Sequence, residues 1–75
     1  MKVIEAVKHI MISANIGVNQ LADRIGLKQS TMSMRLRPDK DIYLSHLNEM
    51  LKGMDYKIII VPRDTKLPKD SYEVE

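Results

Sequence analysis

Apolar residues recur three and four positions apart through most of this 75-residue chain, which is the spacing of one face of an α-helix. They fall into four groups, which predict helices at residues 2–13, 18–25, 29–36 and 42–54. Residues that favour turns or helix ends lie between the groups, namely Asn15, Gly17, Gly26 and Pro38. Asp41 is expected to be the N-cap of the fourth helix, and Asp55 is expected to follow its C-terminal end. The pattern therefore predicts a mainly α fold.

The sequence changes character after the fourth predicted helix. Residues 57–61 form a β-branched run, which predicts a short strand closed by Pro62. The rest of the chain has mixed charge and is either loose or returns as a second strand at residues 71–74. We therefore divide the chain into a helical domain at 1–56 and a C-terminal strand and tail at 57–75.

The second and third predicted helices are joined by a tight turn at Gly26. Glycine supplies a positive φ there without a Cβ clash, and the small Ala22 lets the two helices cross closely. The angle between the helices would be set by an apolar wedge of Leu21, Ile25, Leu27 and Met32. A helix-turn-helix pair of this kind makes its second helix stand out from the body, where it can enter the major groove of DNA.

Basic residues concentrate around the third predicted helix, although the net charge of the chain is only +2. Residues 24–40 hold five basic residues and one acid, whereas from residue 41 onward acids outnumber bases seven to five. A basic middle fits a face that meets a polyanion. On charge alone, an ordinary solvated helix face fits equally well.

The helix-turn-helix stretch resembles the phage repressor and Cro type of DNA-binding protein, also called the xenobiotic-response-element family. The matching residues are Leu21, Ala22, Ile25, Gly26, Leu27, Ser30, Thr31 and Met32, and the resemblance extends over residues 3–54. It implies a four-helix Cro/repressor-like helix-turn-helix domain with a short C-terminal β-strand. It also implies a sequence-specific regulator of transcription that binds double-stranded DNA, acting as a repressor on a two-fold operator. A helical corner without a DNA role is the competing interpretation.

The resemblance implies that bases are read from the third predicted helix, by Gln29, Ser30, Ser33 and Met34. Helical geometry agrees in part, since Met34 points opposite the predicted core pair Met32 and Leu36. Glutamine can pair with adenine N6 and N7, and methionine can touch a thymine methyl group. The alternatives are an exposed methionine without a role and, for Ser30, simple helix N-terminal chemistry.

Phosphate contacts are expected from the start of the second predicted helix and from residues around the third, namely Asn19, Gln20, Lys28, Thr31, Arg35, Arg37 and Lys40. Each cation could instead be an ordinary surface residue. The chain departs from the family at Lys28, where many relatives have a capping Ser or Thr. It departs again at Arg35, where relatives often have an apolar residue and Leu36 is expected to pack instead, and at Pro38, where relatives often have glycine.

The predicted strand is apolar on both faces, because Ile58 and Ile60 point one way and Ile59 and Val61 the other. One face, or the open edge, then needs a cover. We expect a homodimer that pairs these strands, which would place two reading helices about one DNA turn apart. A hairpin within one chain, made with residues 71–74, is the alternative.

Other functional classes find less support. We recognise no catalytic nucleophile paired with a histidine, no glycine-rich phosphate loop and no paired carboxylates in a plausible pocket, so we expect neither an enzyme nor a cofactor. His9 and His46 lie far apart, so we expect no metal site. The longest apolar run is residues 58–61, far short of a membrane span, and the absence of cysteine fits a reducing cytoplasm. The family resemblance implies the cytoplasm of a bacterial or phage-infected cell, at the nucleoid. The remaining alternative is a DNA-binding antitoxin or recombination accessory factor whose strand or tail binds another protein.

Overall fold

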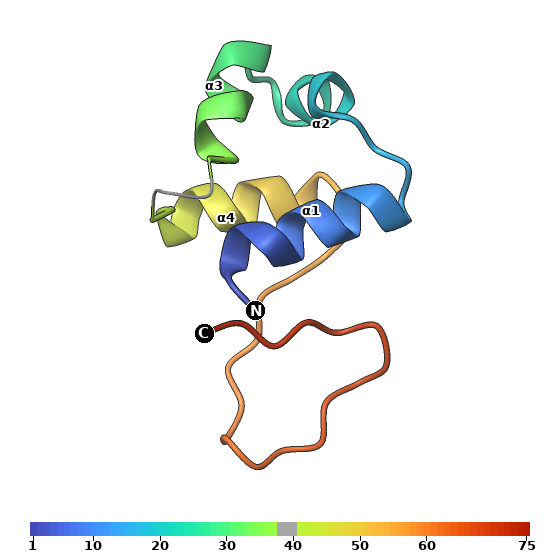
Figure 1. Ribbon diagram of the computed structural model, residues 1–75, viewed down its shortest axis with the longest axis vertical. Helices are drawn as coiled ribbons and strands as arrows, with labels where there is room; N and C mark the ends of the chain where they lie inside the picture. Colours follow the sequence, from blue (N-terminus) through green and yellow to red (C-terminus); the bar gives the residue numbers. More distant parts are fainter. Residues whose placement is uncertain (38–40) are drawn as a thin grey trace.

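The computed structural model describes residues 1–37 and 41–75, and these residues form a mainly helical fold without strands (Figure 1). The helices of this described part are, in chain order, α1 (Val3–Ser13), α2 (Val18–Ile25), α3 (Gln29–Arg35) and α4 (Leu44–Lys52). In Figure 1, α2 and α3 lie above α1 and α4, and the chain after α4 runs below the helices before it returns. The backbone N–H of Glu75 donates to the carbonyl of Met1 at 3.0 Å, so the two ends of the chain meet.

Three of the described helices end in the same way. A residue one to three positions beyond the helix has a positive φ, which is 55° at Asn15 after α1, 73° at Gly26 after α2 and 63° at Asp55 after α4. The next backbone N–H then bonds to a carbonyl five residues back, in the pairs Ile16 to Met11 at 2.8 Å, Leu27 to Ala22 at 2.9 Å and Tyr56 to Leu51 at 2.8 Å. These are positions where the sequence predicts helix ends. Each closure also turns an apolar residue back onto the core.

The fourth helix begins later than the sequence predicts. It starts at Leu44, and the carbonyl of Tyr43 accepts its first helical bond from the N–H of Leu47 at 2.9 Å. The prediction of Asp41 as the N-cap was therefore wrong, because a cap must directly precede the first helical residue. The helix also ends at Lys52 rather than at residue 54.

Every helix that the structure describes contributes to one apolar core. Its most deeply buried side chains are Val7, Leu21, Met32 and Met50, each at most 1% exposed. The backbone at Gly53 lies directly on α2, where an added Cβ would be 2.8 Å from Ile25 Cγ2 and 3.0 Å from Leu21 Cδ1. A hydrogen bond of 3.1 Å from Arg24 Nη1 to the carbonyl of Gly53 fixes the same contact. The end of α4 thus holds α2 in place.

The predicted strand at residues 57–61 is not seen, and neither is the alternative hairpin with residues 71–74, since the described residues contain no strand pairing. A strand exists only through hydrogen bonds to a partner, and no backbone hydrogen bond to that run occurs among residues 1–37 and 41–75. The tail instead returns across the helical domain. There Tyr72 packs against the core, with its ring centroid 6.2 Å from that of His9 and 6.5 Å from that of Tyr56.

None of the helices in residues 1–37 and 41–75 combines the length and apolar character needed to cross a membrane.

Candidate nucleic-acid interface

The corner between α2 and α3 is the feature that positions the candidate interface. Gly26 takes the left-handed conformation, and Leu27 bonds back to the carbonyl of Ala22. Behind the turn, Leu21 and Met32 are both fully buried and so lock one helix against the other. The predicted wedge therefore exists, with Ile25 and Leu27 packed partly buried against the same cluster. Figure 1 shows α3 turned sharply away from α2.

The outer face of α3 carries the residues expected to read bases. Gln29, Ser30, Ser33 and Met34 are all exposed, and Met34 is 58% exposed. The opposite face packs inward through Met32 and, just beyond the helix, Leu36, which is 6% exposed. The four side chains thus share a solvent-facing surface on a helix whose other side is fixed to the core. We call this surface the reading face.

The start of α2 forms the second part of the candidate interface. Gly17 is the N-cap, and its backbone N–H donates to Gln20 Oε1 at 2.8 Å. That bond fixes the side-chain amide of Gln20 and leaves its nitrogen, a donor, available for another group. Asn19 is exposed beside it. Two uncharged donors therefore lie where a helix N-terminus favours an anion.

The cations around α3 fall into different situations. Lys28 is the exposed N-cap residue of α3, with an extended backbone at φ −74° and ψ 150°, and its ammonium cannot replace the capping acceptor of a Ser or Thr. Thr31 in the first turn is also exposed, as is Arg37 just beyond the helix. Lys40, the remaining predicted contact, lies outside the described residues.

Arg35 is used differently from the phosphate contact that the sequence predicts. Its Nη1 donates to Glu49 Oε1 at 2.9 Å, and its side chain is only 13% exposed. The ion pair joins α3 to α4 across fourteen positions of sequence. Glu49 is a residue that sequence reasoning missed, because nothing in its spacing marks it as the partner of Arg35. The observed role of this pair is to hold α3 on the body of the protein.

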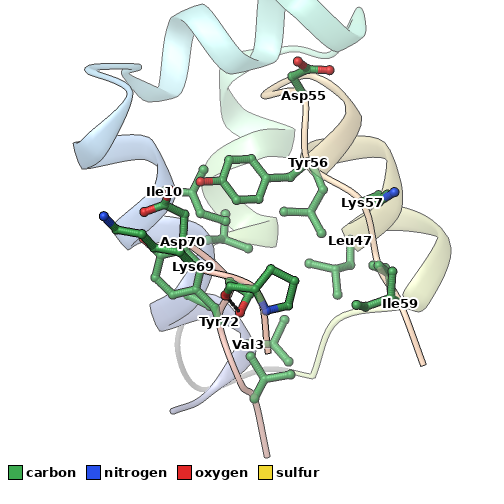
Figure 2. Close-up of a pocket in the computed structure, with 17 residues that line it drawn as sticks. Val3, Ile10, Leu47, Asp55, Tyr56, Lys57, Ile59, Lys69, Asp70 and Tyr72 are labelled. Carbon is green, nitrogen blue, oxygen red and sulfur yellow. Dashed lines mark hydrogen bonds between the residues drawn. The ribbon is translucent and has the colours of Figure 1, made fainter. Parts of the chain in front are cut away.

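A cavity of about 360 Å³ lies on another side of the molecule, between α1, α4 and the returning tail. Figure 2 shows Ile10, Leu47 and Tyr56 around its interior, with Lys69 and Asp70 on one side and Lys57 on the other. None of the described residues that line it belongs to α2 or α3, so it lies away from the reading face. The sequence could not reveal it, because it exists only through the return of the tail.

No cluster of three or more His, Cys, Asp or Glu side chains that could hold a metal occurs in the described part of the chain. Comparison of the chain with models of known protein families, with characterised proteins and with solved structures finds no match.

Proposed function

We propose that this protein binds duplex DNA sequence-specifically, with α3 in the major groove, and regulates transcription by occupying an operator. The observation that carries the proposal is the reading face. It is an exposed surface on a helix that Gly26 and the buried Met32 hold at a sharp corner. The resemblance of the same stretch to repressor and Cro proteins supports the proposal.

The chemistry of the reading face favours base contacts over simple solvation. In a chain with 29% charged residues, α3 carries no charge from Gln29 to Met34. Exposed helix faces that only meet water carry charged or polar side chains, and an exposed apolar residue such as Met34 is not needed for solvation. Uncharged hydrogen-bonding groups beside an apolar tip instead suit base edges, with Gln29 placed for adenine and Met34 for a thymine methyl group.

Phosphate contacts would come from both ends of the corner. Asn19 and Gln20 supply donors at the start of α2, while Lys28 and Thr31 lie at the start of α3. Arg37 adds a cation beyond the last turn of α3. Such contacts set affinity and register, whereas the reading face sets sequence preference. Because Arg35 is held by Glu49, we place it among the residues that orient α3.

We further propose that the protein acts as a homodimer joined through residues 58–61. Ile58, Ile59, Ile60 and Val61 are 37%, 51%, 97% and 38% exposed, so four consecutive apolar side chains face water in one chain. Pairing with the same run of a second copy would supply the missing strand bonds and bury these side chains. A two-fold dimer on an operator in the cytoplasm would exclude polymerase, which is the simplest route to repression.

The direct test is selection from a pool of random duplex DNA at two salt concentrations, followed by sequencing of the bound fraction. We expect a two-fold motif and an affinity that falls steeply as salt rises. A motif without two-fold symmetry would count against the dimer. Failure of folded protein to bind any duplex at low salt would overturn DNA binding altogether.

One observation favours a second function, that of an antitoxin or recombination accessory factor. The exposed apolar run at residues 58–61 could pair with a different protein rather than with a second copy. Sedimentation at tens of micromolar separates the two. A mass of two chains supports the homodimer, and a mass of one chain both in the free protein and on a complete two-fold operator favours a heterologous partner.

A further inference from the structure

The methionines of this chain are numerous and sharply divided by burial. There are six, in a sequence that has neither cysteine nor tryptophan, so the thioethers are its most readily oxidised side chains. Four are almost completely buried, at 7%, 0%, 0% and 6% exposed, namely Met11, Met32, Met50 and Met54. Only two are open to solvent, Met1 at 41% and Met34 at 58%. An oxidant in solution therefore meets Met34 and Met1 before the four buried methionines.

We propose that Met34 is a site of reversible oxidation by peroxides, and that its sulfoxide switches off DNA recognition by α3. The inference rests on the proposed function, because it regulates the same reading face. It also uses a contrast within one short helix, since Met32 lies two positions away and is 0% exposed. The two thioethers share a helix and a sequence neighbourhood and differ in access to solvent.

The chemistry is a two-electron transfer of oxygen. The sulfur lone pair of Met34 attacks one oxygen of hydrogen peroxide, the O–O bond breaks, and a proton moves to the departing hydroxide to form water. Sulfur is oxidised to the sulfoxide and peroxide is reduced to water. Methionine sulfoxide reductases reverse the step with electrons from a thiol, using one enzyme for each epimer of the sulfoxide.

The position of Met34 gives this change its consequence. Its side chain lies on the outer face of α3 with Ser30 and Ser33, where the proposal seats it against a thymine methyl group. A sulfoxide at that point places a strong hydrogen-bond acceptor against the thymine methyl group. The sulfoxide oxygen loses its water there, and the methyl group offers it no donor in exchange. A buried, unpaired polar group of this kind weakens an interface by about tenfold or more.

The test begins with hydrogen peroxide titrated onto folded protein, with peptide mass spectrometry to map sulfoxides. Met34 should be oxidised well before Met32, Met50 and Met54, which serve as internal standards. At the dose that converts Met34 alone or with Met1, circular dichroism should be unchanged. Affinity for the selected operator should fall at least tenfold and recover after treatment with both reductases and dithiothreitol.

Two variants isolate the side chain responsible. In Met34→Leu, which cannot form a sulfoxide, affinity before and after peroxide should agree, whatever its starting value. Because Met1 remains in that variant, agreement also excludes Met1 as the cause. In Met34→Gln, a permanent acceptor should weaken operator binding without any peroxide.

Each contrary result has its own meaning. Oxidation of Met32 at the same rate as Met34 would overturn the proposed site. Selective oxidation of Met34 without loss of affinity would overturn the switch while leaving DNA binding intact. If untreated protein binds no duplex, the proposed function fails and the switch with it, although the sulfoxide map still reports whether Met34 is the reactive site.

Discussion

Gly53→Ala should destabilise the protein, because the new Cβ would collide with α2. It would lie 2.8 Å from Ile25 Cγ2 and 3.0 Å from Leu21 Cδ1. The methyl carbon of Ile25 is attached to Cβ and cannot move aside without a change of rotamer, and Leu21 is completely buried. The backbone itself would tolerate alanine, since Gly53 has φ −63° and ψ −16°.

The size of the effect follows from two opposing contributions. Overpacking a well-filled core costs about 1–3 kcal/mol. Replacing glycine by alanine at a compatible backbone position returns about 0.4–1 kcal/mol by restricting the unfolded chain. The net loss in free energy of unfolding should therefore be about 1–2 kcal/mol. For a domain of this size that lowers the melting temperature by about 4–16 °C.

Thermal unfolding followed by circular dichroism, at one fixed protein concentration, measures this loss. Gly17→Ser is the matched control, because a Cβ at Gly17 meets only Gln20 Oε1, at an ordinary 3.7 Å, and serine is a favoured N-cap. The control should melt at or slightly above the wild-type temperature. If Gly53→Ala melts at the same temperature as Gly17→Ser, the close contact between the end of α4 and α2 does not exclude a larger residue at position 53.

Substitutions at four further positions test other parts of the structure and of the proposed interface. Gly26→Val should lower the free energy of unfolding by about 1–2 kcal/mol, because φ is 73° at this position and a β-branched residue resists it. The cost comes from the backbone and not from a clash, since no heavy atom of the described residues lies within 4 Å of the added Cβ. An unchanged melting temperature would contradict the left-handed conformation of Gly26. Glu49→Ala should lower the free energy of unfolding by about 1–2 kcal/mol, because it leaves the guanidinium of Arg35 without its carboxylate. Glu49→Gln keeps a hydrogen-bond acceptor and should cost less. Urea titration of both variants measures the difference. Gln29→Ala should weaken binding to the preferred operator by about 1–3 kcal/mol and relax the preference at one base position. Lys28→Ala should instead weaken binding to all DNA sequences alike and reduce the salt dependence of the affinity. If Gln29→Ala also weakened binding to all sequences equally, Gln29 would contact the DNA backbone rather than a base.

The helix ends could be predicted because their chemistry is local. Asn15, Gly26 and Asp55 tolerate positive φ better than most residues, and each stands next to an apolar residue that packs inward after the turn. The start of α4 was harder to place, because Tyr43 caps it through its backbone alone and Asp41 offers a stronger sequence signal nearby. The bounds of α1, α2 and α3 therefore agree with the predicted ones to within one residue, whereas α4 begins two residues later and ends two residues earlier than predicted.

The role of Arg35 illustrates what local reasoning misses. In sequence it is one of several cations around the third predicted helix, and the family resemblance favours a phosphate partner for it. In the structure its partner is Glu49, fourteen positions away on a different helix. The packing of α3 against α4 brings the two together, and that packing depends on the whole core. Burial separates Arg35, at 13% exposed, from the exposed Lys28, a distinction that the sequence does not contain.

In the proposed homodimer, the run at residues 58–61 would link dimer formation to operator binding. Its four side chains remain 37–97% exposed, so pairing two copies could bury enough apolar surface to contribute about 10 kcal/mol in total. Association costs about 4–15 kcal/mol in lost freedom, so these side chains alone support only a weak dimer. An operator with two half-sites removes much of that cost by holding both copies in place. Binding to a complete two-fold operator should therefore be cooperative in protein concentration, and a half-site duplex should bind at least tenfold more weakly. Equal affinity for half-site and complete operator in a titration would show that each chain acts alone.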